Sequence, residues 1–294
     1  MQGKKQQRQD NNNNNSGSTA ADRIGATFRR LEQRGERALI CYVVAGYPDA
    51  EATAGIVDAL VAGGADIIEL GIPFSDPIAD GPTIQKASQA ALDAGVTPEK
   101  ALQIAKIVRK RHPDLPLLVM TYSNILVHAG WDGFLSKCRA AGIDGFILPD
   151  MPVEEAGEYT AKAAEHGMAT VFLASPNTSP ERLKEIASHS SGFMYLVSVY
   201  GITGARSSFE DYTKDAIKRA KEAAGHKIPV GVGFGISRPE HARFMAGAGA
   251  DAIIVGSAII DRIARAGGGG RRQQTAMMLA DLKSFAASLK KALK

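Results

Sequence analysis

Short apolar segments alternate with longer amphipathic segments along the chain from Ala21 onward. Eight of the short segments are nearly unbroken apolar runs, at residues 38–46, 65–73, 115–122, 145–150, 170–175, 193–199, 229–234 and 252–256. Each is followed by a segment that fits a helix. Continuous hydrophobicity is typical of parallel strands that helices cover on both faces. Eight such units in about 250 residues predict an α/β fold, a (β/α)8 TIM barrel, rather than an open sheet.

The two ends of the chain differ from this repeating body. Residues 1–20 are rich in Gln and Asn and nearly free of apolar residues, so we expect a disordered polar tail there. Residues 21–294 are expected to form a single barrel domain. An extra helix near residues 21–35 precedes the first strand, where it could close the bottom of the barrel. A last helix is expected near residues 273–292, after the flexible run at 267–270.

A weak internal repeat marks the turn before three of the strands. It places Asp66, Asp144 and Asp251 two residues after a glycine and directly before an apolar run. Such turns lie at the N-terminal face of a barrel, opposite the face that carries active sites. We therefore expect these three aspartates to be structural.

Composition and charge exclude several classes of protein. The 294 residues are 45% hydrophobic and 22% charged, as in ordinary globular proteins. The net charge is +4, but residues 1–20 carry +2 and residues 262–294 carry +7, which leaves −5 on the body of the chain and argues against a nucleic-acid groove. Two cysteines, and no apolar run long enough to span a bilayer, favour a soluble cytoplasmic protein.

Glu69 is the most informative polar residue within a predicted strand. It stands among isoleucine and leucine in a strand that is covered on both sides, so its ionisation is costly and its pKa should be raised. A buried carboxylate that pairs with a cation is the alternative. No predicted strand contains Lys or Arg, so such a partner would have to come from a loop.

Asp80 lies in the loop after the same strand, at the end where a barrel places its active site. It precedes Gly81 and Pro82, and an Asp at this point is also a good N-cap for a helix that starts near Pro82. The residues themselves leave both interpretations open.

Glycine-rich segments follow the last three strands, at residues 201–206, 233–237 and 256–257. Together they form a candidate phosphate cradle of backbone N–H groups. The predicted strands contain neither Lys nor His, so no Schiff-base or metal chemistry is indicated. Acid–base catalysis by carboxylates on a small phosphorylated substrate remains, with Tyr42, Tyr122 or Tyr195 as possible helpers. A sugar-phosphate isomerase or epimerase would fit these residues as well as a lyase.

The segment from Glu69 to Gln85, ELGIPFSDPIADGPTIQ, closely resembles the signature of the tryptophan synthase alpha subunit family. Further similar segments occur in the family's order over residues 22–290, at 45–48, 120–124, 149–152, 201–204, 233–237 and 256–258. The resemblance implies reversible retro-aldol cleavage of indole-3-glycerol phosphate to indole and glyceraldehyde 3-phosphate. It implies no cofactor in this subunit, and a pyridoxal-phosphate beta-subunit partner in an α2β2 heterotetramer of tryptophan biosynthesis.

The resemblance also implies roles for single residues. Glu69, Asp80 and Tyr195 correspond to catalytic positions of the family. The expected substrate-binding residues include two aromatic side chains and the phosphate-side loops: Tyr42, Tyr122, Thr203, Gly204, Gly233, Phe234, Gly235, Gly256 and Ser257.

The chain departs from the family at the 20-residue tail, at the 267–270 run and at Val199-Tyr200, where many members carry Arg and a small residue. Two other functions compete with the implied one. One is a stand-alone lyase that releases free indole, and the other is a catalytically silent, phosphate-binding activator subunit. The presence of both Glu69 and Asp80 disfavours the silent subunit.

Overall fold

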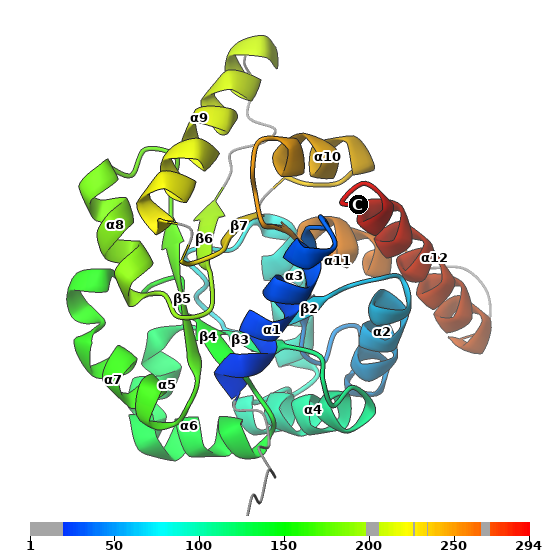
Figure 1. Ribbon diagram of the computed structural model, residues 1–294. Coiled ribbons are helices and arrows are strands. Elements are labelled where there is room, and N and C mark those ends of the chain that lie inside the picture. The colour runs from blue at the N-terminus through cyan, green and yellow to red at the C-terminus, as the bar shows by residue number, and fades with distance from the viewer. Residues whose placement is uncertain (1–19, 198–205, 226, 234, 266–270) are drawn as a thin grey trace, which may run out of the picture.

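A computed structural model of the chain describes residues 20–197, 206–225, 227–233, 235–265 and 271–294. Eight parallel strands close into one barrel in sequence order, and β1 also pairs with β8 (Figure 1). The strands are β1 (Ala38–Val44), β2 (Ile67–Gly71), β3 (Leu117–Met120), β4 (Gly145–Ile147), β5 (Ala169–Ala174), β6 (Met194–Val197), β7 (Val230–Gly233) and β8 (Ala252–Val255). The predicted (β/α)8 barrel is confirmed. The tail before residue 20, the 267–270 run and Val199-Tyr200 lie outside the described residues.

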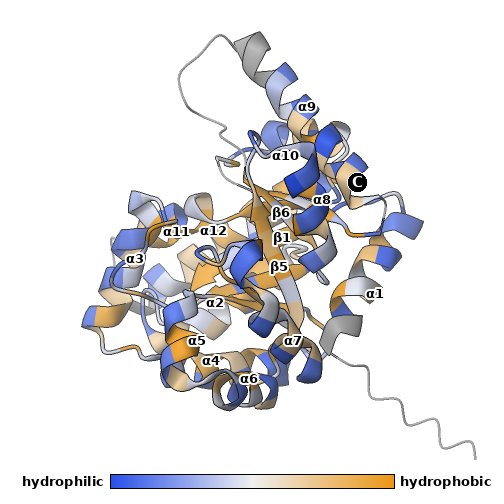
Figure 2. Ribbon diagram, turned by 90° about the vertical axis from the view of Figure 1, so that its left-hand side faces the viewer, coloured by the Kyte–Doolittle hydropathy of each residue, from blue (hydrophilic) through white to orange (hydrophobic). Residues whose placement is uncertain are grey.

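Helices surround the barrel and cover the outer face of its strands, except that α1 lies across one end of the barrel (Figure 1). They are α1 (Ala20–Gln33), α2 (Ala50–Ala62), α3 (Pro82–Asp93), α4 (Pro98–Arg111), α5 (Ser123–Ala129), α6 (Trp131–Ala140), α7 (Gly157–Glu165), α8 (Pro180–His189), α9 (Arg206–Ala224), α10 (Pro239–Gly247), α11 (Ser257–Ala264) and α12 (Arg271–Lys291), with a short 3₁₀ turn at Val153–Glu155. Apolar residues concentrate on the central strands, and polar residues face outward on the helices (Figure 2). The strands are therefore buried on both faces, as their continuous hydrophobicity predicts.

Local sequence explains where several helices begin. Asp49, Thr97 and Ser179 each have extended backbone, and each side chain accepts a hydrogen bond from a backbone N–H of the first turn. Thr97 and Ser179 are also followed by Pro, whose missing N–H costs nothing at the first position of a helix. These caps fix the point at which the chain turns from a loop into a helix.

Helix α1 closes the bottom of the barrel, as its place before β1 suggested. Ile24, Phe28 and Leu31 are buried against residues that fill the barrel interior, and the Phe28 ring lies 6.1 Å from that of Phe193. Burial of each such side chain contributes about 1.5 to 3 kcal/mol. The N-terminal face is therefore sealed, and the opposite face remains for a site.

Four αβ turns at this N-terminal face share one interaction. One residue of each turn accepts, with its side-chain oxygen, a hydrogen bond from the backbone N–H of a residue near the start of the preceding strand. The backbone N–H of the turn residue donates in return to the carbonyl oxygen of that strand residue. The pairs are Asp66 with Leu39, Asp144 with Leu117, Ser191 with Thr170 and Asp251 with Val230.

Each of the three aspartates also pairs with a cation. Lys290 bonds Asp66, Arg109 and Arg23 bond Asp144, and Lys221 bonds Asp251. The three aspartates of the sequence repeat therefore hold the ends of paired strands in register, which is a structural role. The fourth turn uses Ser191 in place of an aspartate, and the sequence repeat did not reveal it.

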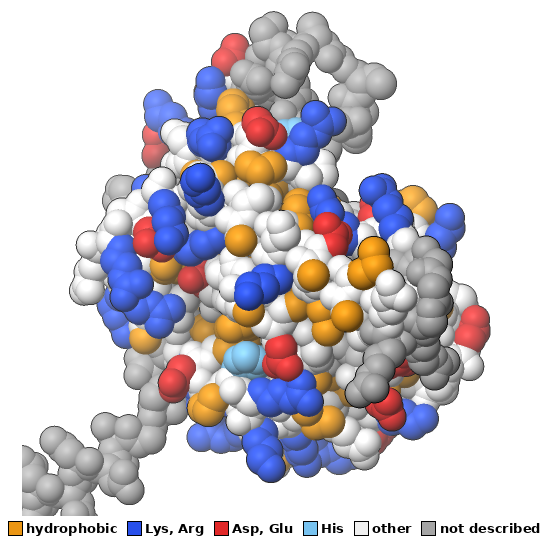
Figure 3. Space-filling model, turned by 90° about the vertical axis from the view of Figure 1, so that its right-hand side faces the viewer, with side chains coloured by type: hydrophobic (Ala, Val, Ile, Leu, Met, Phe, Trp, Pro, Cys, Tyr) orange, Lys and Arg blue, Asp and Glu red, His pale blue; other side chains and the backbone are white. Residues whose placement is uncertain are grey.

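The surface of the barrel carries mixed charge. Acidic and basic side chains share the face drawn in Figure 3, with apolar side chains scattered between them. Both cysteines, Cys41 and Cys138, are free and buried. No described helix is both long enough and apolar enough to cross a membrane.

Candidate active site

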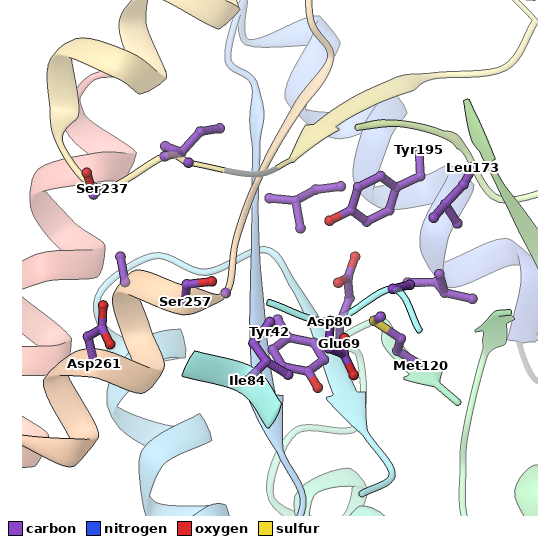
Figure 4. A pocket seen from close by; sticks show the side chains of 17 residues that line it. Tyr42, Glu69, Asp80, Ile84, Met120, Leu173, Tyr195, Ser237, Ser257 and Asp261 are labelled. Atoms are coloured by element: carbon purple, nitrogen blue, oxygen red, sulfur yellow. The ribbon is translucent and has the colours of Figure 1, made fainter. Parts of the chain in front are cut away.

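A cavity of about 230 Å³ opens at the C-terminal ends of the strands, the face opposite α1. Its wall comes from most strands of the barrel and from the loops after β2, β7 and β8. The lining residues are Tyr42, Glu69, Ala79, Asp80, Ile84, Met120, Ile147, Leu173, Tyr195, Gly235, Ile236, Ser237, Ile254, Gly256, Ser257, Ala258 and Asp261. Figure 4 shows Tyr42, Glu69, Asp80 and Tyr195 at one end and Ser237, Ser257 and Asp261 at the other.

Glu69 points from β2 into the cavity and is 1% exposed. Within the described residues its Oε1 has no hydrogen-bond partner. Burial raises the pKa of this carboxyl from 4.5 to about 8. The alternative of a buried ion pair finds no support, because none of the ion pairs formed by described residues includes Glu69. At neutral pH the side chain is therefore mostly a neutral acid that faces a cavity.

Asp80 reaches the same cavity from the loop after β2, and its surroundings are more polar. The Tyr122 hydroxyl donates to Asp80 Oδ2 at 3.3 Å and accepts the Ala79 N–H at 3.1 Å. Burial raises the pKa of Asp80, and the hydrogen bond from Tyr122 opposes that rise. Its Oδ1 is buried and, among the described residues, has no partner.

The helix-cap interpretation of Asp80 is wrong. Helix α3 starts at Pro82 as expected, but its N-cap is Gly81, which provides no side-chain bond. The Asp80 carbonyl oxygen instead accepts a hydrogen bond from Gln85 Nε2 at 2.8 Å. The Asp80 carboxylate is thus available to the cavity rather than engaged at the helix start.

The rings of Tyr42 and Tyr195 each pack against a glycine of the neighbouring strand. A side chain at Gly71 would collide with the Tyr42 ring and hydroxyl, and one at Gly233 would collide with those of Tyr195. Burial raises the pKa of both tyrosines, with smaller contributions from the charges of Glu69 and Asp80. Both therefore keep their protons at neutral pH.

Gly233 and Tyr122 lie behind the cavity wall. Gly233 makes room for the Tyr195 ring, and Tyr122 contacts Asp80, so neither lines the cavity itself. Burial raises the pKa of Tyr122 to about 12, so its hydroxyl remains a donor to Asp80. Both residues act on the site through a neighbour.

The expected phosphate cradle is described in part. Gly235, Gly256 and Ser257 line the far end of the cavity, and Ser257 is the first residue of α11. Gly235 has a φ of +73°, a conformation that favours glycine. Thr203, Gly204 and Phe234 lie outside the described residues. The N-terminus of α11 and the backbone around Gly235 offer N–H groups to an anion.

The sequence did not single out the apolar part of the wall. Met120, Ile147, Leu173 and Ile254 come from β3, β4, β5 and β8. Strand pairing aligns two of them with each other, since Ile147 pairs with Met120, and aligns Leu173 with Tyr195. Alternation along each strand could have found them once the register was known. They make this end of the cavity suitable for a flat apolar group.

Known proteins share both the sequence and the fold. The sequence profile of the tryptophan synthase alpha chain family matches residues 28–294. A tryptophan synthase alpha chain from Methanosarcina acetivorans is 47% identical over 262 residues, which covers 89% of this chain and 93% of the relative. One from Solibacter usitatus is 43% identical over 269 residues, which covers 92% and 97%.

Solved structures agree. The tryptophan synthase subunit alpha of Legionella pneumophila is similar with a TM-score of 0.83 and 35% identity, covering 92% of this chain and 98% of that one. A chain of the aminoacrylate-bound tryptophan synthase from M. tuberculosis gives a TM-score of 0.79 at 33% identity, covering 92% and 99%. The chain therefore belongs to the tryptophan synthase alpha chain family.

Proposed function

We propose that this chain cleaves indole-3-glycerol phosphate to indole and glyceraldehyde 3-phosphate, as the alpha subunit of a tryptophan synthase. Two of the three buried, unpartnered side-chain oxygens in the described residues belong to Glu69 and Asp80, and both residues line one cavity. An unpaired buried oxygen is costly, so a ligand that supplies donors to both is favoured. This observation carries the proposal, and family membership supports it.

The different surroundings of the two carboxyls suit the two tasks of a retro-aldol cleavage. Neutral Glu69 delivers a proton to indole C3. The ionised Glu69 then takes the proton of the adjacent hydroxyl as the bond from C3 to the glycerol carbon breaks. The broken bond's electrons restore the indole ring, and Glu69 ends as it began, protonated. Its raised pKa places it between acid and base in the neutral range.

Asp80 serves the other end of the indole ring. Positive charge develops toward N1 when C3 is protonated, and an ionised carboxylate that accepts the N1–H stabilises that charge. The Tyr122 hydroxyl favours the ionised form of Asp80 because it donates to it. The loop after β2 thus supplies the second catalytic carboxylate.

The remaining wall holds the substrate. The apolar residues Met120, Ile147 and Leu173 contact the indole, with Tyr42 beside it, and Tyr195 lies near Glu69. Backbone N–H groups around Gly235, Gly256 and Ser257 hold the phosphate at the start of α11. None of these steps requires a cofactor.

We further propose that the chain acts in the cytoplasm in an α2β2 complex with a beta subunit, which binds at the cavity rim. Ile78 is 80% exposed, and Phe74 from the same loop packs on Tyr122 with ring centroids 4.9 Å apart. A partner that covers Ile78 would therefore act on Asp80 through Phe74 and Tyr122. This route explains how binding could raise turnover.

Absorbance of indole released from indole-3-glycerol phosphate tests the proposal. We expect turnover by the isolated chain and faster turnover with saturating beta subunit. No indole in either case would contradict the proposed reaction. Equal rates with and without the beta subunit would favour a stand-alone lyase and would contradict the proposal that beta-subunit binding raises turnover.

A further inference from the structure

A hydrogen bond joins the helix that follows Asp80 to the helix at the phosphate end of the cavity. Thr83 Oγ1 donates to Asp261 Oδ1 at 3.2 Å, across 178 positions of sequence. Thr83 lies in the first turn of α3, Asp261 lies in α11, and both are half-buried. The bond therefore connects the two ends of the proposed active site.

Each helix carries a residue that the proposed reaction uses. Helix α3 begins two residues after Asp80, and Gln85 in its first turn holds the Asp80 carbonyl oxygen. Helix α11 begins at Ser257, one turn before Asp261, and both of these residues line the cavity (Figure 4). A shift of α11 would therefore displace Asp80, because the hydrogen bond from Thr83 to Asp261 links α11 to the first turn of α3.

The position of Asp261 does not suit a simple role in binding the substrate. A carboxylate close to the phosphate end repels an anion and weakens its binding. Among the described residues, the Asp261 carboxylate accepts a hydrogen bond from Thr83, whereas the neighbouring Arg262 pairs with Asp281 on α12. The hydrogen bond to α3 therefore accounts for a carboxylate at this position, whereas phosphate binding does not.

We propose that Asp261 is a positioning residue, which holds the start of α3 through Thr83 and so places Asp80 when a phosphate group occupies the N-terminus of α11. The two halves of the substrate are then coupled, because the phosphate at one end improves the fit of the indole at the other. This inference rests on the proposed function and adds residues to it that do not touch the reacting atoms.

Kinetics of variants at Thr83 and Asp261 test the link. Thr83→Val removes the hydroxyl at nearly constant shape, Thr83→Ser keeps it, Asp261→Ala removes the acceptor, and the double variant combines Thr83→Val with Asp261→Ala. We expect Thr83→Val and Asp261→Ala each to lower kcat about tenfold, as for loss of a hydrogen bond to a charged group. KM should change less than about twofold in Thr83→Val and should fall in Asp261→Ala, which also removes the negative charge from the phosphate end. Thr83→Ser should retain kcat within about twofold.

The double variant separates coupling from two independent effects. The double variant should be no slower than either single variant, because each single substitution already breaks the same hydrogen bond. Losses that multiply, or a Thr83→Val variant with the kcat of the parent chain, would overturn the proposal. Asp261→Asn keeps an acceptor without the charge, so it should retain kcat and lower KM.

A binding measurement decides the question without turnover. Isothermal titration of indole is performed with and without saturating glycerol 3-phosphate, a stable analogue of the triose phosphate. Glycerol 3-phosphate should tighten indole binding in the parent chain and in Thr83→Ser, but not in Thr83→Val. Absence of this effect in the parent chain, or its persistence in Thr83→Val, would refute the link. Failure of the parent chain to form indole would instead refute the proposed function, and the titration would still decide the link.

Discussion

The raised pKa of Glu69 makes the stability of the protein depend on pH in an unusual direction. An acid whose pKa is higher in the folded state binds its proton more tightly there, so its stabilising effect is present below pH 4.5 and is lost as pH rises to about 8. The difference between the two pKa values corresponds to roughly 5 kcal/mol in total. Between pH 5 and pH 8 the expected loss is roughly 3 kcal/mol.

Glu69→Gln removes this dependence at nearly constant shape. The free energy of unfolding, from urea denaturation followed by circular dichroism, is compared for the variant and the parent chain at pH 5 and pH 8. The variant's advantage should increase by roughly 3 kcal/mol over this range, because the amide does not ionise. The same variant should lose indole formation by at least about 10² to 10⁴-fold.

Glu185→Gln provides the matched control, because Glu185 is exposed on α8. Its unfolding free energy relative to the parent chain should stay constant between pH 5 and pH 8. A pH-independent difference for Glu69→Gln as well would show that Glu69 ionises freely in the folded protein. The assignment of a neutral, buried acid would then be wrong.

Three further substitutions test separate parts of the site and fold. Asp80→Asn should fold normally, since Gly81 rather than Asp80 caps α3, yet lose most steady-state indole formation; near-normal turnover would exclude Asp80 from catalysis. Gly256→Val should raise KM for indole-3-glycerol phosphate far more than it lowers kcat, because its Cβ would lie 3.4 Å from Tyr42 and its methyl groups would take up space in the cavity; an unchanged KM would place the substrate elsewhere. Asp144→Ala should lower the urea-unfolding free energy by about 3 to 5 kcal/mol, because Arg109 loses its buried partner; a loss below about 1 kcal/mol would contradict the structural role.

The barrel itself was predictable because its strands are buried on both faces. Seven of the eight observed strands lie inside their predicted ranges, and β5 starts one residue before its range, since a continuous apolar run bounded by turn residues has few other solutions. The apolar environment of the Glu69 carboxyl was predictable for the same reason, because apolar residues surround any side chain on a strand that is covered on both faces.

Interactions between distant segments were not predictable in the same way. The sequence offered Asp80 as a cap because capping depends on local residue types, but contact with Tyr122, 42 residues away, positions its carboxylate. The sequence repeat did not reveal the turn at Ser191, because a serine hydroxyl takes the place of the aspartate carboxylate there. The sequence did not single out Asp261, because only the packing of α11 against α3 brings its carboxylate to Thr83.

The pH dependence of kcat/KM for indole formation tests the central claim most directly, because it reports the protonation states that the free enzyme needs. With Glu69 neutral and Asp80 ionised in the active form, kcat/KM should fall as pH rises through about 8. A kcat/KM that stays constant from pH 6 to pH 9 would contradict the claim that a protonated Glu69 starts the cleavage.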